Sequence, residues 1–479
     1  MVVMKFGGSS VATAAAIARV RAIVGAERRP RVVVVSALAG VTDMLLALAA
    51  RAEARDDEAA LRALQGIRDR HASLAAAVRD RGARHDLLAR LDTHWTDAET
   101  VVRAVSLLKA CPPAASDAIV AQGELASSLL VAAILKDAGL PAEWIDARRV
   151  VVTDGAHQHA APLPGNTADR LARLVQPLVA RGTIPVLGGF IGATTDGVTT
   201  TLGRGGSDYS ASLVGACVGA AEIQIWTDVD GMLTADPRLY SRTRLVGRLS
   251  FAEASALARF GAKVLHPSTV RPAVLAGIPV RILNSHRPAG RGTLVADGPV
   301  RRTAAVAGIA SLPHICVFDV TLPDGTARPA ALAAVFEACA QAQAAVHLMA
   351  VSERGVSVAV DDGPASDRVA ARLGPDQQVT RRGGLALVAA VGDALAASQG
   401  IAWRALAACA AIPVRLLSCS PGSNQVAWAV DQADLAFAVA TLHEFLFERQ
   451  ATFETGDGRT VASAAPLAAC QETPQEVRA

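Results

Sequence analysis

Aromatic residues are scarce in this chain of 479 residues. Phe, Trp and Tyr together make up 4% of the sequence, and only two residues are tyrosines. A surface that binds its partner by aromatic stacking is therefore not expected. The 47 basic and 44 acidic residues give a formal net charge of +3. A charge this small argues against a nucleic-acid partner held by a basic face.

Cysteine is also sparse, and its positions are scattered. The seven cysteines include no CxxC pair, and their number is odd. This pattern favours buried, reduced thiols over a disulfide framework or a zinc site. We therefore expect a protein of the reducing cytoplasm, with no metal-binding side chains.

Long apolar runs and a secretory signal are not evident in the sequence. The chain begins MVVMKFGG, without the charged lead, apolar run and cleavage site of a signal peptide. A spanning helix needs an uninterrupted apolar stretch of about 18 residues or more. We expect no membrane partner, although hydrophobic residues make up 51% of the chain.

What the sequence does contain is an alternation of short apolar runs with helical stretches. The run VVMKF, a helix over about residues 12–24, the run RVVVVSAL and a helix over about 42–54 predict an α/β fold with a parallel sheet covered on both faces. Residues 54–110 have helical spacing and almost no glycine, which predicts a helical insertion. Strand signals return at LPAEWIDA, TIPVLGGFIGAT, AEIQIWTDV and IPVRILN, so the α/β layer extends to about residue 295.

Beyond this layer, two stretches repeat one design of strand, helix and strand. The first runs from HICVFDVTL to VHLMAVSERGVSVAV, and the second from GLALVAAVG to VRLLSCSPGSNQVAWAV. A chain of this length exceeds what one hydrophobic core usually organises. We predict a large domain over 1–297, two small βαββ-type modules in tandem over 298–382 and 383–454, and a polar tail over 455–479.

Glycines and a lysine at the first predicted strand are typical of a phosphate site. Lys5 lies near the strand end, and the backbone amides of Gly7 and Gly8 can approach a phosphate while the lysine supplies positive charge. Ser36 and Thr42 follow the second strand at the carboxyl edge of the sheet, where open α/β sheets bind ligands. Taken alone, the first segment can also be a tight turn, and such hydroxyls are more often an N-cap and a turn.

The densest polar segment is TTTLGRGGSDYS, at residues 199–210. Glycines, hydroxyls, Arg204 and Asp208 occur there within one loop that leads into a helix, as a site for a carboxylate and a phosphate requires. A simple turn would not need an arginine and an aspartate together. Glu124, near a glycine at the start of another helix, can hold an ammonium group, although helix capping is the simpler explanation for it in isolation.

A second polar loop follows the run AEIQIWTDV. It supplies Asp228, Asp236 and Arg238. Nucleotide phosphates bind cations such as arginine, and the Mg²⁺ that accompanies them binds oxygen ligands such as carboxylates. Lys263, in FGAKVLHP, can reach the same phosphates. Each of these signals is weak when it is taken separately.

Six motifs, in this order, resemble the aspartokinase branch of the amino acid kinase superfamily. They are KFGGSSVA, SALAGVTDMLL, QGEL, TTTLGRGGSDYSA, IWTDVDGMLTADPR and FGAKVLHPSTV, and they cover residues 1 to about 295. The region from GLALVAAVG to LHEFLFE resembles the ACT-domain region of the monofunctional, lysine-sensitive type. The resemblance implies an amino acid kinase fold, with a mostly parallel open sheet between helices, followed by tandem ferredoxin-like ACT domains.

The resemblance also implies ATP- and Mg²⁺-dependent phosphorylation of the side-chain carboxylate of L-aspartate to 4-phospho-L-aspartate, the first step towards lysine, threonine and methionine. Lys5 would stabilise the transferred phosphoryl group, and Asp208 would organise that lysine. Arg204 would meet the α-carboxylate of aspartate, and Glu124 its amine. The positions that match the aspartate site are Ser36, Thr42, Glu124, Phe190, Arg204 and Ser207. The positions that match the nucleotide site are Lys5, Gly7, Gly8, Thr227, Asp228, Asp236, Arg238 and Lys263.

Three departures from the family pattern leave the nucleotide contacts and the regulation open. Leu233 stands where the family usually has a tyrosine that contacts the nucleotide. His347 stands where an acidic residue is expected to meet the ammonium group of an effector, and VTLPDGTARPAAL carries extra residues in the first module. The sequence thus leaves open whether lysine, threonine, both or neither is the effector.

Two alternative functions also follow from these residues. One is a kinase of the same superfamily that acts on glutamate, N-acetylglutamate or UMP, and the other is an inert amino-acid sensor. Because ACT modules commonly pair across subunits, we expect a homodimer or a larger homo-oligomer.

Overall fold

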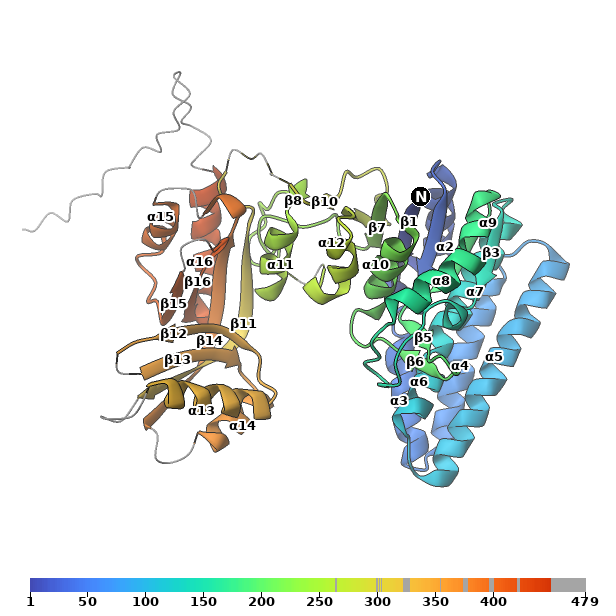
Figure 1. Ribbon diagram of the computed structural model, residues 1–479, viewed down its shortest axis with the longest axis horizontal. Helices are drawn as coiled ribbons and strands as arrows, with labels where there is room; N and C mark the ends of the chain where they lie inside the picture. The colour runs from blue at the N-terminus through green and yellow to red at the C-terminus, as the bar shows by residue number, and fades with distance from the viewer. Residues whose placement is uncertain are drawn as a thin grey trace, which may run out of the picture.

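The structure is a computed structural model. The residues that it describes are 1–262, 265–298, 300, 302, 304–321, 328–353, 355–373, 378–395, 400–419 and 423–448. Figure 1 shows two bodies, a larger α/β body at the right and a smaller body at the left that is built on a second sheet. The predicted polar tail over 455–479 lies outside the described residues.

The larger body is built on an eight-stranded sheet in the order β3-β4-β2-β1-β7-β9-β10-β8. Its strands are β1 (Val2–Phe6), β2 (Arg31–Val35), β3 (Ala142–Ile145), β4 (Ile184–Gly188), β7 (Glu222–Thr227), β8 (Arg248–Leu249), β9 (Val280–Asn284) and β10 (Thr293–Val295). All neighbouring strands are parallel except β9 and β10. Strands β1 and β4 are buried at every position, as expected for parallel strands that are covered on both faces.

Helices cover both faces of this sheet because alternate residues of each strand point to opposite sides. Val2 and Met4 pack with one set of helices, whereas Val3 packs with the other. The first set is α2 (Ala14–Ala26), α3 (Val41–Glu53) and α7 (Gln122–Asp137). The second set is α8 (Pro164–Leu174), α10 (Gly206–Val218), α11 (Phe251–Arg259) and α12 (Arg271–Leu275). The predicted α/β class is confirmed.

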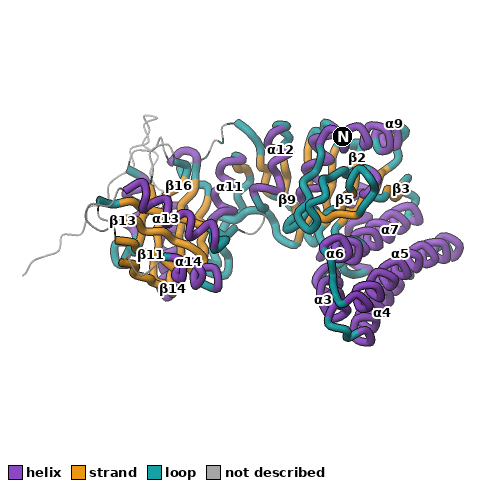
Figure 2. Tube along the Cα trace, turned by 60° about the horizontal axis from the view of Figure 1, so that its bottom comes forward, coloured by secondary structure: helices purple, strands orange, loops and turns teal. Residues whose placement is uncertain are grey.

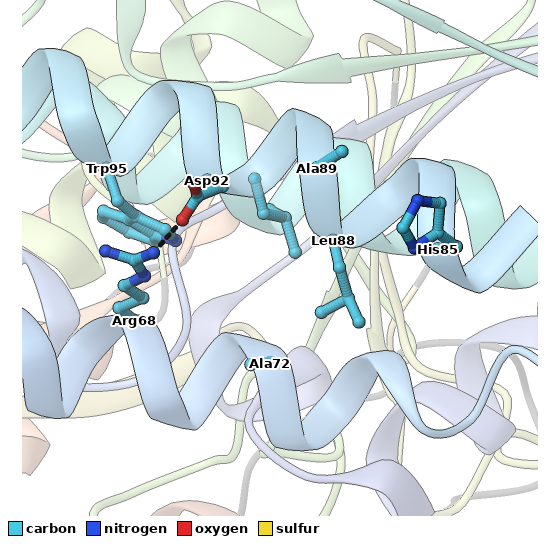
Figure 3. Close-up of a pocket in the computed structure, with 8 residues that line it drawn as sticks. Arg68, Ala72, His85, Leu88, Ala89, Asp92 and Trp95 are labelled. Carbon is cyan, nitrogen blue, oxygen red and sulfur yellow. Dashed lines mark hydrogen bonds and ion pairs between the residues drawn. The ribbon is translucent and has the colours of Figure 1, made fainter.

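The predicted helical insertion consists of α4 (Asp57–Ala75) and α5 (Arg81–Leu108), which run side by side and pack on α3 and α7 (Figure 2). A cavity of about 330 Å³ lies between α4 and α5 (Figure 3). Arg68 on α4 and Asp92 on α5 form an ion pair beside Trp95 in the wall of this cavity. The cavity therefore belongs to the insertion and not to the carboxyl edge of the sheet.

One apolar stretch, Pro113–Asp137, is long enough by length and composition to cross a membrane. No membrane span was expected there from the sequence. It contains α6 (Pro113–Val120) and α7, and 89% of its most apolar window is buried inside the protein. Its apolar character is therefore explained by its position in the core, where α7 lies against β3 and β4.

The smaller body is built on a six-stranded sheet in the order β12-β13-β11-β14-β16-β15. Its strands are β11 (Gly308–Thr321), β12 (Val346–Val351), β13 (Gly355–Asp361), β14 (Gln378–Val391), β15 (Leu416–Cys419) and β16 (Gln425–Asp431). Its helices are α13 (Arg328–Gln341), α14 (Pro364–Arg372), α15 (Ile401–Ala408) and α16 (Leu435–His443). The predicted repeat of strand, helix and two strands is present twice.

The two modules share the long strands β11 and β14. Residues 315–321 of β11 pair with β13 and with 378–385 of β14, whereas residues 308–312 pair with 387–391. The second module is thus extended by residues 308–312, the start of the long strand β11 of the first module, which pair with the end of β14. The predicted boundary between 382 and 383 falls inside β14, so the modules are interleaved and not simply consecutive.

Six of the seven cysteines lie in the described part of the chain, and none of these six forms a disulfide. Cys316, Cys339 and Cys409 are buried, as the expectation of buried thiols requires. Cys419 is exposed, so that expectation does not hold for every cysteine.

Candidate active site

Polar residues gather where four parallel strands end side by side. In the register of the sheet, Phe6 of β1 lies beside Val35 of β2 and Trp226 of β7, and Val35 lies beside Gly188 of β4. Ser36 directly follows β2. Because parallel strands end at one edge of a sheet, four predicted segments that lie far apart in the sequence meet there.

Lys5 and Asp208 form an ion pair at this edge. The Lys5 Nζ lies 2.6 Å from the Asp208 Oδ1, and the two side chains are 10% and 20% exposed. Asp208 lies in the first turn of α10, which begins after Gly205 in the left-handed region (φ 73°). The contact brings together the two residues expected at the chemical step. It also places the positive charge of Lys5 near the N-terminus of a helix, so both favour an anion bound there.

Close backbone approaches position the residues around this pair. A Cβ atom on Gly189 would lie 2.8 Å from the Cβ of Ser207, so only glycine lets the turn after β4 touch the start of α10. Phe190 has a φ of 63°, and its backbone N–H donates to the Ser210 Oγ at 2.9 Å. A Cβ atom on Gly8 would similarly lie 2.8 Å from the carbonyl oxygen of Ala37. Phe190 and Ser207 are thereby brought together.

Glu124 is a buried carboxylate with one unused oxygen. Its Oε1 accepts a hydrogen bond at 3.2 Å from the N–H of Ala37, the residue after Ser36. Its Oε2 is buried and has no hydrogen-bond partner among the described residues. Burial raises the pKa of Glu124 from its ordinary 4.5 to about 8. The Ser127 Oγ donates to the Ser36 carbonyl at 2.8 Å and holds the same loop against α7. A buried oxygen without a partner is suited to receive a cationic group of a ligand.

The second polar loop connects β7 to β8. The Thr227 hydroxyl donates to the Asp228 carboxylate at 3.1 Å, and Asp236 forms an ion pair with Arg238 at 2.6 Å. The Arg238 side chain is 82% exposed. Leu233 is half-buried and forms a backbone bridge with Leu245. This loop therefore presents a cation to solvent.

Some of the predicted site residues have no polar side-chain contact with the others. The side chains of Arg204 and Thr42 form no hydrogen bond or ion pair within the described residues, and Arg204 is exposed. Lys263 lies outside the described residues. Asp117 on α6 is a fully buried acid that was not among the predicted site residues, and its signal in the sequence is its place in an apolar helix.

The chain matches known proteins over most of its length. The profile of the Amino acid kinase family matches residues 1–284. The lysine-sensitive aspartokinase 3 of Escherichia coli K12 is 34% identical over 460 residues, which is 94% of this chain and 99% of that protein. The chain belongs to the aspartokinases of the amino acid kinase family.

Solved structures of this family have the same fold. E. coli aspartokinase III in complex with aspartate and ADP (R-state) is 31% identical with a TM-score of 0.78, and the match covers 94% of this chain and 100% of that one. The same enzyme with lysine and aspartate (T-state) is 32% identical with a TM-score of 0.80 and the same coverage. The bifunctional aspartokinase/homoserine dehydrogenase 1 of Arabidopsis thaliana is 31% identical, and the match covers 95% of this chain but 52% of that protein.

Proposed function

We propose that this chain phosphorylates the side-chain carboxylate of L-aspartate with ATP and forms 4-phospho-L-aspartate and ADP. The observation that carries the proposal is the Lys5–Asp208 ion pair at the strand ends, together with the buried Glu124 carboxylate that binds the loop after β2. The E. coli relative that was solved with aspartate and ADP supports the same substrates. A reaction that consumes ATP also suits the cytoplasmic location expected from the cysteine pattern.

Aspartate would bind between α7, the loop after β2 and the start of α10. The Glu124 carboxylate would receive its ammonium group, because a cation there gives the buried Oε2 a partner. Arg204, exposed in the loop before α10, would hold the α-carboxylate with its planar guanidinium. Ser36, Thr42, Phe190 and Ser207 would complete the aspartate site.

The chemical step needs no covalent intermediate. An oxygen of the aspartate side-chain carboxylate would attack the γ-phosphorus of ATP, and the bond from that phosphorus to the β–γ bridging oxygen would break as ADP leaves. The attacking carboxylate is already ionised at neutral pH, so no proton has to be removed. Lys5 would neutralise the negative charge on the phosphoryl group in the transition state of its transfer, and Asp208 would hold the lysine in place.

The nucleotide would lie on the β7 side of this pair. Gly7 and Gly8 would offer backbone amides to its phosphates, with Thr227, Asp228, Asp236, Arg238 and Lys263 as further contacts. No group of three or more His, Cys, Asp or Glu residues able to hold a metal ion occurs among the described residues. Mg²⁺ commonly binds through substrate phosphates, waters and one or two carboxylates, so a Mg²⁺ ion that arrives with ATP fits this site and would neutralise phosphate charge.

The smaller body would bind an amino-acid effector and join subunits. The E. coli structure with lysine and aspartate supports an effector of this class. His347, which stands where an acidic residue was expected, lies with its Nε2 2.9 Å from the Asp361 Oδ1. Asp361 would therefore supply the negative charge on that part of the sheet, and the identity of the effector would follow from assays with lysine, threonine and methionine.

The test is ADP release from ATP and Mg²⁺ with aspartate, glutamate, N-acetylglutamate or UMP as the acceptor, together with trapping of the acyl phosphate from aspartate as a hydroxamate by hydroxylamine. We expect product from aspartate alone, and we expect Lys5→Ala to give only background. Absence of product with the wild-type protein, or a higher kcat/KM for another acceptor, would disprove the proposal.

A further inference from the structure

Asp117 is a buried carboxylate that the proposed chemistry does not use. It lies on α6, and its side chain is 2% exposed. Its Oδ1 accepts from the Thr201 hydroxyl at 2.7 Å, and its Oδ2 lies 2.8 Å from the His157 Nδ1. The backbone N–H groups of Gln158 and Thr201 also donate to it, at 3.1 to 3.3 Å. Such a set of donors compensates the cost of burying the charge.

These contacts join three segments that are remote in the sequence. Thr201 ends β6 (Thr199–Thr201), which forms a hairpin with β5 (Ile191–Ala193). His157 and Gln158 belong to a surface loop, and the Ala160 N–H of that loop donates to the Thr201 carbonyl at 2.9 Å. The carboxylate on α6 therefore holds the end of β6 and the neighbouring loop in one arrangement.

The end of β6 is also the start of the segment proposed to bind aspartate. Residues 202–208 follow Thr201 directly and carry Arg204 and Asp208. The 158–159 loop lies so close to Gly203 that a Cβ there would be 2.6 Å from the His159 Nδ1. Gly203 and Gly205 both have positive φ values, so the segment bends sharply on either side of Arg204. An exposed arginine between two glycines depends on the fixed end of β6 for its position.

We propose that Asp117 is a positioning residue for aspartate binding, which acts through Thr201 to fix the 202–208 segment. The inference rests on the proposed function, because Arg204 is taken to meet the α-carboxylate of aspartate. The described residues proposed for the nucleotide lie on β1, on its following turn, at the end of β7 and in the loop after it, and none of them forms a hydrogen bond or an ion pair with Asp117. Loss of the Asp117–Thr201 bond should therefore weaken aspartate binding more than ATP binding.

The test compares Thr201→Val with Thr201→Ser. Valine keeps the branched shape of threonine but removes the donor, whereas serine keeps the hydroxyl. A hydrogen bond to a charged group contributes enough that its loss should raise the KM for aspartate about tenfold in Thr201→Val, with the KM for ATP changed less than about twofold. Thr201→Ser should restore most of the aspartate affinity. Asp117→Asn should give a similar split, and the double variant should fall short of the product of the two effects.

Hydrogen exchange of the amides in 202–208 gives a readout that does not depend on activity. Thr201→Val should exchange faster there than the wild type and Thr201→Ser, while α2 remains unchanged. Equal rises in the two KM values, or an unchanged aspartate KM with unchanged exchange, would overturn the inference. If the wild type does not phosphorylate aspartate but Thr201→Val still exchanges faster in this segment, the proposed function fails while the positioning by Asp117 is supported.

Discussion

Glu124→Gln tests whether the buried carboxylate is protonated before aspartate binds. Burial raises the pKa of Glu124 from 4.5 to about 8. Between pH 4.5 and about pH 8 the folded protein keeps a proton on Glu124 that the unfolded chain has released, so the free energy of unfolding decreases as the pH rises through this window. Glutamine keeps the shape and an acceptor for the Ala37 N–H but does not titrate. The variant should therefore lack this loss of stability.

The size of the effect follows from the pKa difference. Each unit of pKa corresponds to about 1.4 kcal/mol, so the rise from 4.5 to about 8 corresponds to about 5 kcal/mol in full. Roughly 2 kcal/mol of this falls between pH 6 and pH 7.5, which in a domain of this size changes the Tm by about 4 °C. Over that interval, the Tm of the wild type should fall by this amount relative to Glu124→Gln.

The assay is thermal unfolding at both pH values, with Glu58→Gln as the matched control. The Glu58 side chain is 85% exposed, so its replacement should leave the pH dependence of the wild type unchanged. Parallel Tm curves for the wild type and Glu124→Gln would refute the reasoning, because they would mean that Glu124 titrates alike in both states. If aspartate binds as proposed, its ammonium group should also lower the pKa of Glu124, and the KM for aspartate should fall from pH 6 to pH 8 in the wild type only.

Three further predictions concern the reacting pair, the close approach at Gly189 and the assembly. Lys5→Met should lower kcat roughly 10³-fold with a small change in the KM for aspartate, and a variant that retains most of its activity would contradict the role of Lys5. Gly189→Ala should destabilise the protein by about 1–3 kcal/mol because its Cβ meets Ser207, whereas Gly155→Ala, with open space around it, should stay within about 0.5 kcal/mol in denaturant unfolding. Light scattering at micromolar concentration should give a dimer or larger, and a monomer would be inconsistent with pairing through the smaller body.

Local elements could be predicted from the sequence because their signals are local. The valine-rich runs became β1 and β2, and the helix expected over 12–24 appears as α2, with Thr13 as its N-cap accepting from the Ala16 N–H. Gly40, with a φ of 80°, precedes α3 where the second helix was expected. The order of strands and helices in the smaller body followed in the same way, although α14 was not foreseen.

The candidate site could be predicted in part. Asp208 lies in a segment whose arginine and aspartate a simple turn would not need, and the structure brings Lys5, from another predicted segment, into contact with it. Asp117 carried no comparable signal, because its proposed positioning role depends on hydrogen bonds from residues 157, 158 and 201. Hydrogen bonds over such sequence separations leave no periodic pattern in the chain.

The sequence by itself determined the α/β class, the helical insertion and the residue types at the strand ends, since apolar periodicity and glycine positions report local conformation and burial. Only the tertiary structure decided which segments became partners. It paired residues 308–312 with 387–391, left one oxygen of Glu124 without a donor, and joined Asp117 to Thr201. Periodicity records that a segment is buried but not what it is buried against, because many partners bury the same apolar face equally well.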